Sequence, residues 1–159
     1  MPIIMQNLIK QVHLRLLKSG KTIATAESCT AGLLSSLLTL FPDSSRYFIL
    51  GITTYSNESK KSILRIPASV IRKKGAVSQE TALLMAQRIE KLAKTDLGIS
   101  ITGIAGPTGA TPQKPVGTVF IALSSKNINF CKKFVFKGTR NSVRQQATLK
   151  ALKLLKNIL

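Results

Sequence analysis

Three short segments carry the side chains that could do chemistry, and each is predicted to follow a strand. The first is AESCTAG at 26–32, which holds Ser28 between an apolar segment and a helical one. The second is TYSNESK at 54–60, which ends in Lys60. A serine and a lysine can supply a nucleophile and a base without any histidine. If the fold brings these two segments together, the pattern indicates a nucleophilic hydrolase.

The residues after Ser28 are small and polar, as a helix start requires. Unpaired N–H groups at a helix start carry the positive end of the helix dipole. Near Cys29 and Thr30 they could hold a phosphate or the oxyanion of a tetrahedral intermediate. The alternative is that Ser28 or Thr30 is an ordinary N-cap, and the local pattern by itself favours that interpretation. Glu27 could orient Lys60 or form an ion pair.

The third segment is the glycine-rich loop TGIAGPTG at 102–109, which continues to Gly117. Its glycines allow the backbone to approach a ligand closely. Their spacing matches neither the dinucleotide fingerprint nor the P-loop. A long surface connection is the alternative, but loops of this length inside a compact domain are usually functional.

The small number of histidines, cysteines and acidic residues excludes several kinds of catalytic site. The single histidine, His13, lies in a helical pattern beside Leu8, Val12 and Leu16, so it is expected on a partly covered helix surface. A Ser-His-Asp triad is therefore not expected. Two distant cysteines and six scattered acids argue against a zinc site, and we expect no metal and no cofactor. Lys60 could act as a base if burial lowered its pKa; the alternative is a solvated lysine.

The composition of the chain indicates a folded, basic protein of one domain. The 159 residues fit one domain, and 44% of them are apolar, which argues against disorder. The net charge of +18 attracts anions such as phosphorylated metabolites, nucleic acid or acidic lipid, without choosing among them. No apolar run is long enough to span a membrane. No signal peptide is predicted, and two cysteines that form no disulfide framework suit a reducing compartment, so we expect a cytoplasmic protein.

Helical and strand patterns alternate along the chain. Strands are predicted at 22–26, 48–55, 96–102, 118–123 and 130–136, the last two around a turn at 124–129. Helices are predicted at 3–18, 30–41, 57–64, 67–74, 78–94 and 139–159. This order predicts an α/β fold, a three-layer α/β/α sandwich around a mixed, mostly parallel sheet. We expect one domain over 1–159.

These segments together resemble the CinA C-terminal domain family, whose characterised members include nicotinamide-nucleotide amidases. The matching segments run in family order and cover nearly the whole chain: AESCTAG at 26–32, TYSNESK at 54–60, GAVSQETALLMA at 75–86, ITGIAGPTG at 101–109, KPVGTV at 114–119 and GTRNSVRQQAT at 138–148. The resemblance implies a stand-alone form of the domain, assembled as a homodimer or higher homo-oligomer. It also implies a small phosphorylated nucleotide as substrate.

The resemblance assigns roles to individual residues. Ser28 matches the nucleophile, Lys60 the base, and Tyr55 a tyrosine of the site. Cys29 and Thr30 fall at the oxyanion position, and Cys29 is expected to be a packing residue rather than the nucleophile. The remaining matches border the nucleotide or its phosphate: Thr102, Gly103, Ala105, Gly106, Arg140 and Arg144. For the two arginines, a solvated helix face is the alternative.

Three positions depart from the family pattern, since Ala31, Asp43 and Ala110 stand where glycine is usual. The implied reaction is hydrolysis of the carboxamide of nicotinamide mononucleotide to nicotinate mononucleotide and ammonia. Two other functions stay open: an amidase for another phosphorylated amide, and a non-catalytic protein that binds nucleic acid or a phosphorylated ligand. Nucleic acid is less favoured, because only 5% of residues are aromatic and none is tryptophan.

Overall fold

The computed structural model describes residues 3–159, with side chains from residue 5 onward. Helices and strands follow one another in the predicted order, with one additional 3₁₀ turn, η1. The elements are α1 (Ile3–Ser19), β1 (Ile23–Glu27), α2 (Leu33–Leu38), η1 (Ser44–Arg46), β2 (Phe48–Thr53), α3 (Asn57–Ser62), α4 (Ala68–Lys74), α5 (Gln79–Ala93), β3 (Leu97–Gly103), β4 (Thr118–Ser125), β5 (Ile128–Val135) and α6 (Arg140–Ile158).

The five strands form one mixed sheet in the order β2-β1-β3-β4-β5. Strands β2 and β3 pair in parallel with β1 on either side of it. Strand β4 runs antiparallel to both β3 and β5. The carboxyl ends of β1, β2 and β3 therefore meet at one end of the sheet, where ligands bind in open α/β folds.

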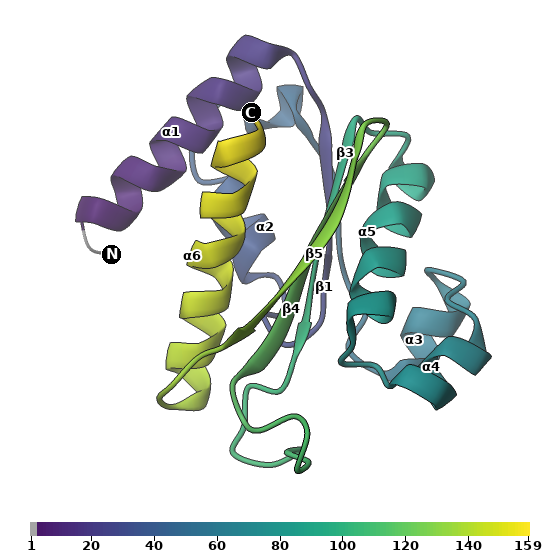
Figure 1. Ribbon diagram of the computed structural model, residues 1–159. Coiled ribbons are helices and arrows are strands. Elements are labelled where there is room, and N and C mark those ends of the chain that lie inside the picture. The colour runs from purple at the N-terminus through teal and green to yellow at the C-terminus, as the bar shows by residue number, and fades with distance from the viewer. Residues whose placement is uncertain (1–2) are drawn as a thin grey trace.

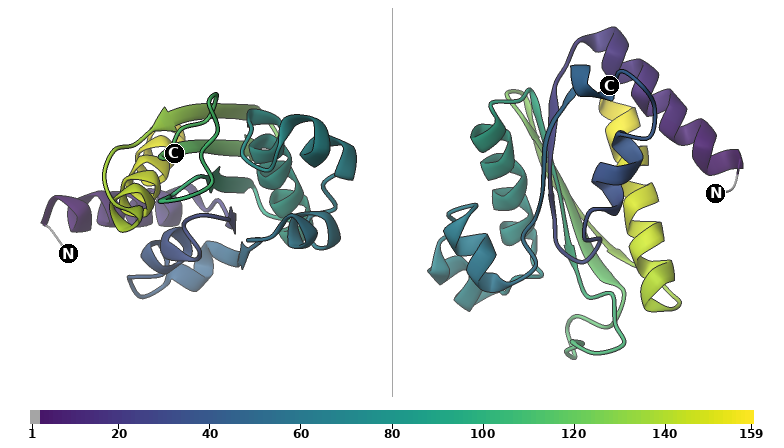
Figure 2. Two further views of the ribbon diagram at one scale, coloured as in Figure 1. Left: turned by 90° about the horizontal axis from the view of Figure 1, so that it is seen from below. Right: turned by 180° about the vertical axis from the view of Figure 1, so that it is seen from behind.

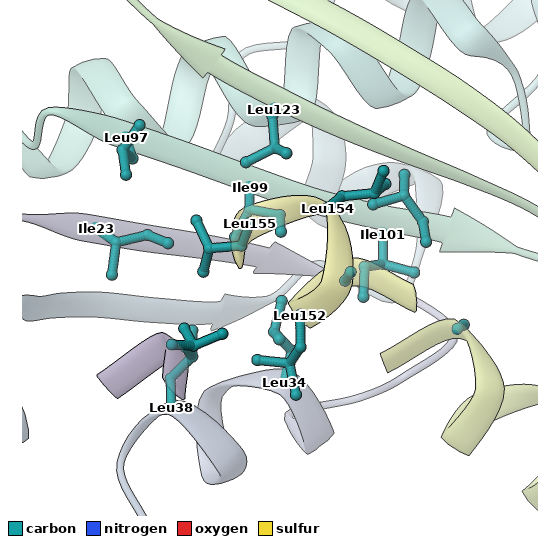
Figure 3. Close-up of a cluster of buried hydrophobic side chains, with 14 of the residues drawn as sticks. Ile23, Leu34, Leu38, Leu97, Ile99, Ile101, Leu123, Leu152, Leu154 and Leu155 are labelled. Atoms are coloured by element: carbon teal, nitrogen blue, oxygen red, sulfur yellow. The ribbon is translucent and has the colours of Figure 1, made fainter. Parts of the chain in front are cut away.

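Helices cover both faces of the sheet, which confirms the three-layer α/β/α prediction (Figure 1). Helices α1, α2 and α6 lie on one face, and α5 covers the other with α3 and α4 beside its start. The main core fills the space between the sheet and α1, α2 and α6. It includes Leu34, Ile99, Ile101, Leu123 and Leu152, all less than 1% exposed (Figure 3).

Helix α2 differs most from its prediction. The sequence pattern predicts a helix over 30–41, but α2 begins at Leu33 after Gly32, whose left-handed backbone forms the N-cap without a side-chain bond. The interpretation of Ser28 or Thr30 as the N-cap is therefore wrong. The terminal hairpin is also tighter than predicted, because β4 and β5 extend to Ser125 and Ile128.

Two of the three departures from the family pattern lie where the backbone is left-handed. Ala31 has φ 51° and Asp43 has φ 65°. A side chain at such a position costs roughly 1–2 kcal/mol relative to glycine. This chain thus carries backbone strain at Ala31, three residues after Ser28.

The long loop between β3 and β4 lies at the same end of the sheet as the carboxyl ends of β1 and β3 (Figure 1). The first turn of α6 reaches the same end, as the views from below and behind show (Figure 2). Segments far apart in sequence are thereby brought together there. Among residues 3–159, no helix is long and apolar enough to cross a membrane.

Candidate active site

Ser28 and Lys60 meet at the carboxyl end of β1. The N–H of Ser28 donates to the carbonyl of Ile101 at 2.9 Å, which extends the β1–β3 pairing by one residue and fixes the backbone of Ser28. Lys60 lies in α3, whose start is fixed by Ser56, since the Ser56 hydroxyl accepts from the N–H of Ser59. The Lys60 Nζ lies 3.1 Å from the Ser28 Oγ.

The surroundings of the Lys60 amine are buried and uncharged. Lys60 is 1% exposed, and its Nζ also donates to the carbonyls of Thr54 at 2.7 Å and Tyr55 at 3.2 Å. Among the residues that the structure describes, its hydrogen-bond partners are two carbonyls and one hydroxyl, none of which carries a charge. Burial therefore lowers the pKa of Lys60 to about 8. At neutral pH a usable fraction of this amine is unprotonated and can accept a proton from Ser28.

Glu27 takes neither of the two roles expected from the sequence. Its carboxylate accepts four hydrogen bonds from the start of α2: from the N–H groups of Gly32, Leu34 and Ser35, and from the Ser35 hydroxyl, at 2.7–3.1 Å. Glu27 is fully buried. The negative charge thus satisfies the N-terminus of α2, and the Glu27 carboxylate is not among the hydrogen-bond partners of the Lys60 amine.

This arrangement also corrects the expectation that the helix start itself would hold an oxyanion. Glu27 already occupies the N–H groups at the start of α2. Within the part of the chain that the structure describes, the N–H groups of Cys29 and Thr30 donate to no carbonyl, hydroxyl or carboxylate of another residue. Both follow Ser28 directly, and they are the backbone donors that remain for an anion at this site.

Cys29 has the environment of a packing residue. The side chain is 5% exposed and belongs to the main core cluster. Burial raises the pKa of the Cys29 thiol to about 11. Because the thiolate is the nucleophilic form, this raised pKa disfavours Cys29 as a nucleophile at neutral pH.

Tyr55 and Arg140 meet across the site, although 85 residues separate them. The Arg140 guanidinium donates to the Tyr55 hydroxyl at 2.6 Å and to the carbonyl of Gly106 at 2.9 Å. The ring of Tyr55 is 55% exposed. Arg140 thus joins the end of β2, the glycine-rich loop and the start of α6.

Arg144 lies one turn further along α6 and donates to the carbonyl of Thr30 at 3.0 Å. Arg144 Nε, Thr30 Oγ1 and Thr54 Oγ1 are buried and have no hydrogen-bond partner among the residues that the structure describes. Buried polar groups are almost always hydrogen-bonded, so these atoms suit a bound polar ligand or water. Thr54 was not identified from the sequence, since it acts through a backbone carbonyl, which every residue type has.

The other loop residues shape the site rather than present polar atoms to it. The Thr102 hydroxyl donates to the carbonyl of Ala76 at 2.9 Å. Ala105 is 4% exposed and packs in the main core. A Cβ at Gly103 would lie 2.7 Å from the Cγ2 of Val119, so only glycine fits there. Among residues 3–159, no three His, Cys, Asp or Glu side chains come together as a metal site would require.

Comparison with known proteins agrees with this architecture. The sequence model of the CinA C-terminal domain matches residues 5–159. A CinA-like protein of Thermotoga neapolitana is 46% identical over 149 residues, which is 93% of this chain and 36% of that protein. A CinA-like protein of Kosmotoga olearia is 47% identical over 142 residues, 89% of this chain and 34% of that one. The chain thus spans about a third of the length of these relatives.

Solved structures show the same fold. The competence/damage inducible protein CihA of Agrobacterium tumefaciens has a TM-score of 0.95 at 31% identity, and the match covers 99% of this chain and 96% of that one. A competence-damaged protein (CinA) superfamily protein of Escherichia coli has a TM-score of 0.93 at 32% identity, over 98% and 90% of the two chains. This chain belongs to the CinA C-terminal domain family.

Proposed function

We propose that this chain is an amidohydrolase that converts nicotinamide mononucleotide to nicotinate mononucleotide and ammonia. The observation that carries the proposal is the buried Lys60 amine, which lies 3.1 Å from the Ser28 hydroxyl and otherwise donates to backbone carbonyls. A serine with a lysine base is one of the known ways to activate a hydroxyl nucleophile. The resemblance of the surrounding segments to nicotinamide-nucleotide amidases supplies the substrate.

In the proposed first half-reaction, neutral Lys60 takes the proton from the Ser28 hydroxyl as the oxygen attacks the carboxamide carbon. The oxyanion that forms accepts from the N–H groups of Cys29 and Thr30, each worth a factor of about 10²–10³ in rate. The Lys60 ammonium then returns its proton to the amide nitrogen, the C–N bond breaks, and ammonia leaves an acyl-Ser28 ester.

In the second half-reaction, Lys60 takes a proton from a water molecule that attacks the ester carbonyl. The C–O bond to Ser28 breaks, the serine regains its proton, and nicotinate mononucleotide is released. The unpartnered hydroxyls of Thr30 and Thr54 could hold this water. No oxidant, reductant or metal enters this sequence of steps.

Two cationic side chains at the start of α6 suit the other end of the substrate. Arg140 is exposed, and Arg144 keeps a buried Nε–H without a partner. Guanidinium groups bind phosphate through charge-assisted hydrogen bonds. The half-exposed ring of Tyr55 offers a face on which a cationic pyridinium can lie.

Ammonia release from nicotinamide mononucleotide tests the proposal, with purified wild type, Ser28→Ala and Lys60→Met. Both substitutions should lower kcat by a factor of at least about 10³, as loss of a nucleophile or its base does. Lys61→Met is the matched control, since Lys61 follows Lys60 directly but forms a surface ion pair with Glu58. Activity should persist in Lys61→Met.

The other outcomes separate the alternatives. Full activity in Ser28→Ala would overturn the nucleophile. Activity that disappears with Cys29→Ala but not with Ser28→Ala would transfer that role to the thiol. An inactive, folded wild type that hydrolyses another phosphorylated carboxamide in a substrate panel would keep the reaction and replace the substrate. No hydrolysis at all would leave the non-catalytic alternatives.

A further inference from the structure

A large hollow lies away from the site just described. It is an open groove of about 1230 Å³ between α1, the later turns of α6, and β5. Helices α1 and α6 come together near the end of α6 and diverge toward the first turn of α1 (Figures 1 and 2). The guanidinium of Arg15 fixes the closed end, where it donates to the carbonyl of Lys156 at 2.9 Å.

The groove has an apolar floor and a basic rim. The floor is formed by side chains from all three elements: Met5, Leu8, Phe134, Leu149 and Leu154. Four lysines stand around it: Lys132, Lys150, Lys153 and Lys156. None of the described side chains that line the groove is acidic, so the positive charge of this rim is not neutralised within the lining.

We propose that this groove binds an acidic amphipathic helix of another protein. The α6 residues that line it run from Gln145 to Asn157, which is about 18 Å of helix, or roughly three turns. A partner helix of the same length would place leucine-type side chains on the apolar floor at i, i+3, i+4 and i+7. Its acidic side chains would then face the lysine rim, which provides the charge complementarity that selects such a partner.

A second copy of this chain does not offer such a segment. The chain has six acidic residues in 159, and they are dispersed along it. Glu27 is buried, and Glu58 and Glu80 already form ion pairs with lysines. Two copies of +18 would bring like charges together at the lysine rim.

Nucleic acid suits the rim but not the floor. A phosphate backbone needs no apolar surface, and single strands are bound by stacking bases on open aromatic rings. Among the described residues that line the groove, Phe134 alone is aromatic. It is stacked on Phe136 at 5.6 Å and covered by the Lys150 ammonium at 5.0 Å from its centroid. Such a ring is not open for a base.

Binding of a designed peptide tests the proposal. The probe is a fluorescein-labelled helical peptide of about three turns, with leucine at i, i+3, i+4 and i+7 and glutamate at most other positions. Fluorescence anisotropy compares it with a scrambled peptide of the same composition and with a single-stranded oligothymidylate. We expect the amphipathic peptide to bind at least about tenfold more tightly than the scrambled one, a difference of about 1.4 kcal/mol.

Two double variants with equal charge change locate the binding. Lys150→Glu/Lys153→Glu alters the groove, and Lys73→Glu/Lys91→Glu alters exposed positions on α4 and α5 beyond the opposite face of the sheet. The groove variant should lose at least about tenfold in affinity, and the α4/α5 variant less than about threefold, since distant exposed charges are screened. Leu149→Asn should also weaken binding, and the thermal midpoint of each variant checks that it is folded.

Four results would overturn the proposal. The first is equal binding of the scrambled peptide, which would mean that the apolar floor is not used. The second is an equal loss in both double variants, which would indicate only the overall charge. The third is binding of the oligothymidylate that is lost in the groove variant, together with no such loss for the peptide. The fourth is a change of oligomeric state in the groove variant by analytical ultracentrifugation, which would identify a self-interface. Deamidase activity enters none of these readouts.

Discussion

The burial of Lys60 has a measurable effect on stability, because its charged form is disfavoured only in the folded protein. The pKa of this amine falls from its ordinary value of 10.5 to about 8 on folding. Between these two pH values the unfolded chain binds the proton and the folded chain does not. By linkage, folding stability must therefore rise as the pH rises through this window.

The size of the effect follows from the two pKa values, since one pH unit corresponds to about 1.4 kcal/mol. At pH 7 the penalty for the buried ammonium is about 3 kcal/mol, and at pH 10 it has fallen to about 1 kcal/mol. Lys60 is 1% exposed, so solvent screening does not reduce these values. Wild type should thus gain about 2 kcal/mol relative to Lys60→Met between pH 7 and pH 10.

The assay is urea unfolding of wild type and Lys60→Met at pH 7, 8, 9 and 10. Only the difference between the two free energies of unfolding is used, because every other titrating group is present in both proteins. Lys61→Met serves as the control for loss of a lysine at the adjacent surface position. A flat difference for Lys60→Met would show that Lys60 keeps its ordinary pKa in the fold, and the physical basis for its role as a base would be lost.

Three further predictions concern the same end of the sheet. The value of kcat/KM should rise about tenfold per pH unit below a pKa of about 8 and level off above it, because only neutral Lys60 accepts the proton; a profile flat from pH 6 to 9 would contradict this. Glu27→Gln should lower the free energy of unfolding by about 3 kcal/mol, since an amide cannot accept all four bonds from α2, while Glu58→Gln at the surface should cost less than about 1 kcal/mol in the same urea titration. Ala31→Gly should raise the thermal midpoint, because it removes about 1 kcal/mol of backbone strain at a residue with φ 51°; a lower midpoint would refute the strain.

The elements were predictable because their signals are local. Helical spacing, β-branched segments and turn residues identified the strands and helices, and the carboxyl ends of parallel strands explain why Ser28 and Lys60 could be expected to meet. The start of α2 was not predictable in this way. Its N–H groups are satisfied by Glu27, which lies in β1 and reaches Gly32, Leu34 and Ser35 through its side chain. The helix propensities of residues 30–41 give no information about these hydrogen bonds, because Glu27 lies outside the helix.

Other contacts of the site are made by backbone carbonyls, which are the same in every residue type. The carbonyls of Thr54 and Tyr55 hold the Lys60 amine, and the carbonyl of Gly106 holds Arg140. Any residue at these positions offers the same carbonyl, so no sequence pattern marks them. The contact of Arg140 with Tyr55 joins residues 85 positions apart, and it exists only because α6 begins at the end of the sheet where β2 stops.

The roles of Glu27 and Lys60 are linked through charge. A carboxylate paired with the Lys60 amine would favour its charged form and keep the pKa high, and the lysine could not then act as a base at neutral pH. Two acids lie near this site in sequence: Glu58, which pairs with Lys61 at the surface, and Glu27, which lies next to Ser28. Its carboxylate instead binds the start of α2, and carbonyl and hydroxyl oxygens surround the amine. The start of α2 thus binds the Glu27 carboxylate, and burial is the main cause of the lowered pKa of Lys60.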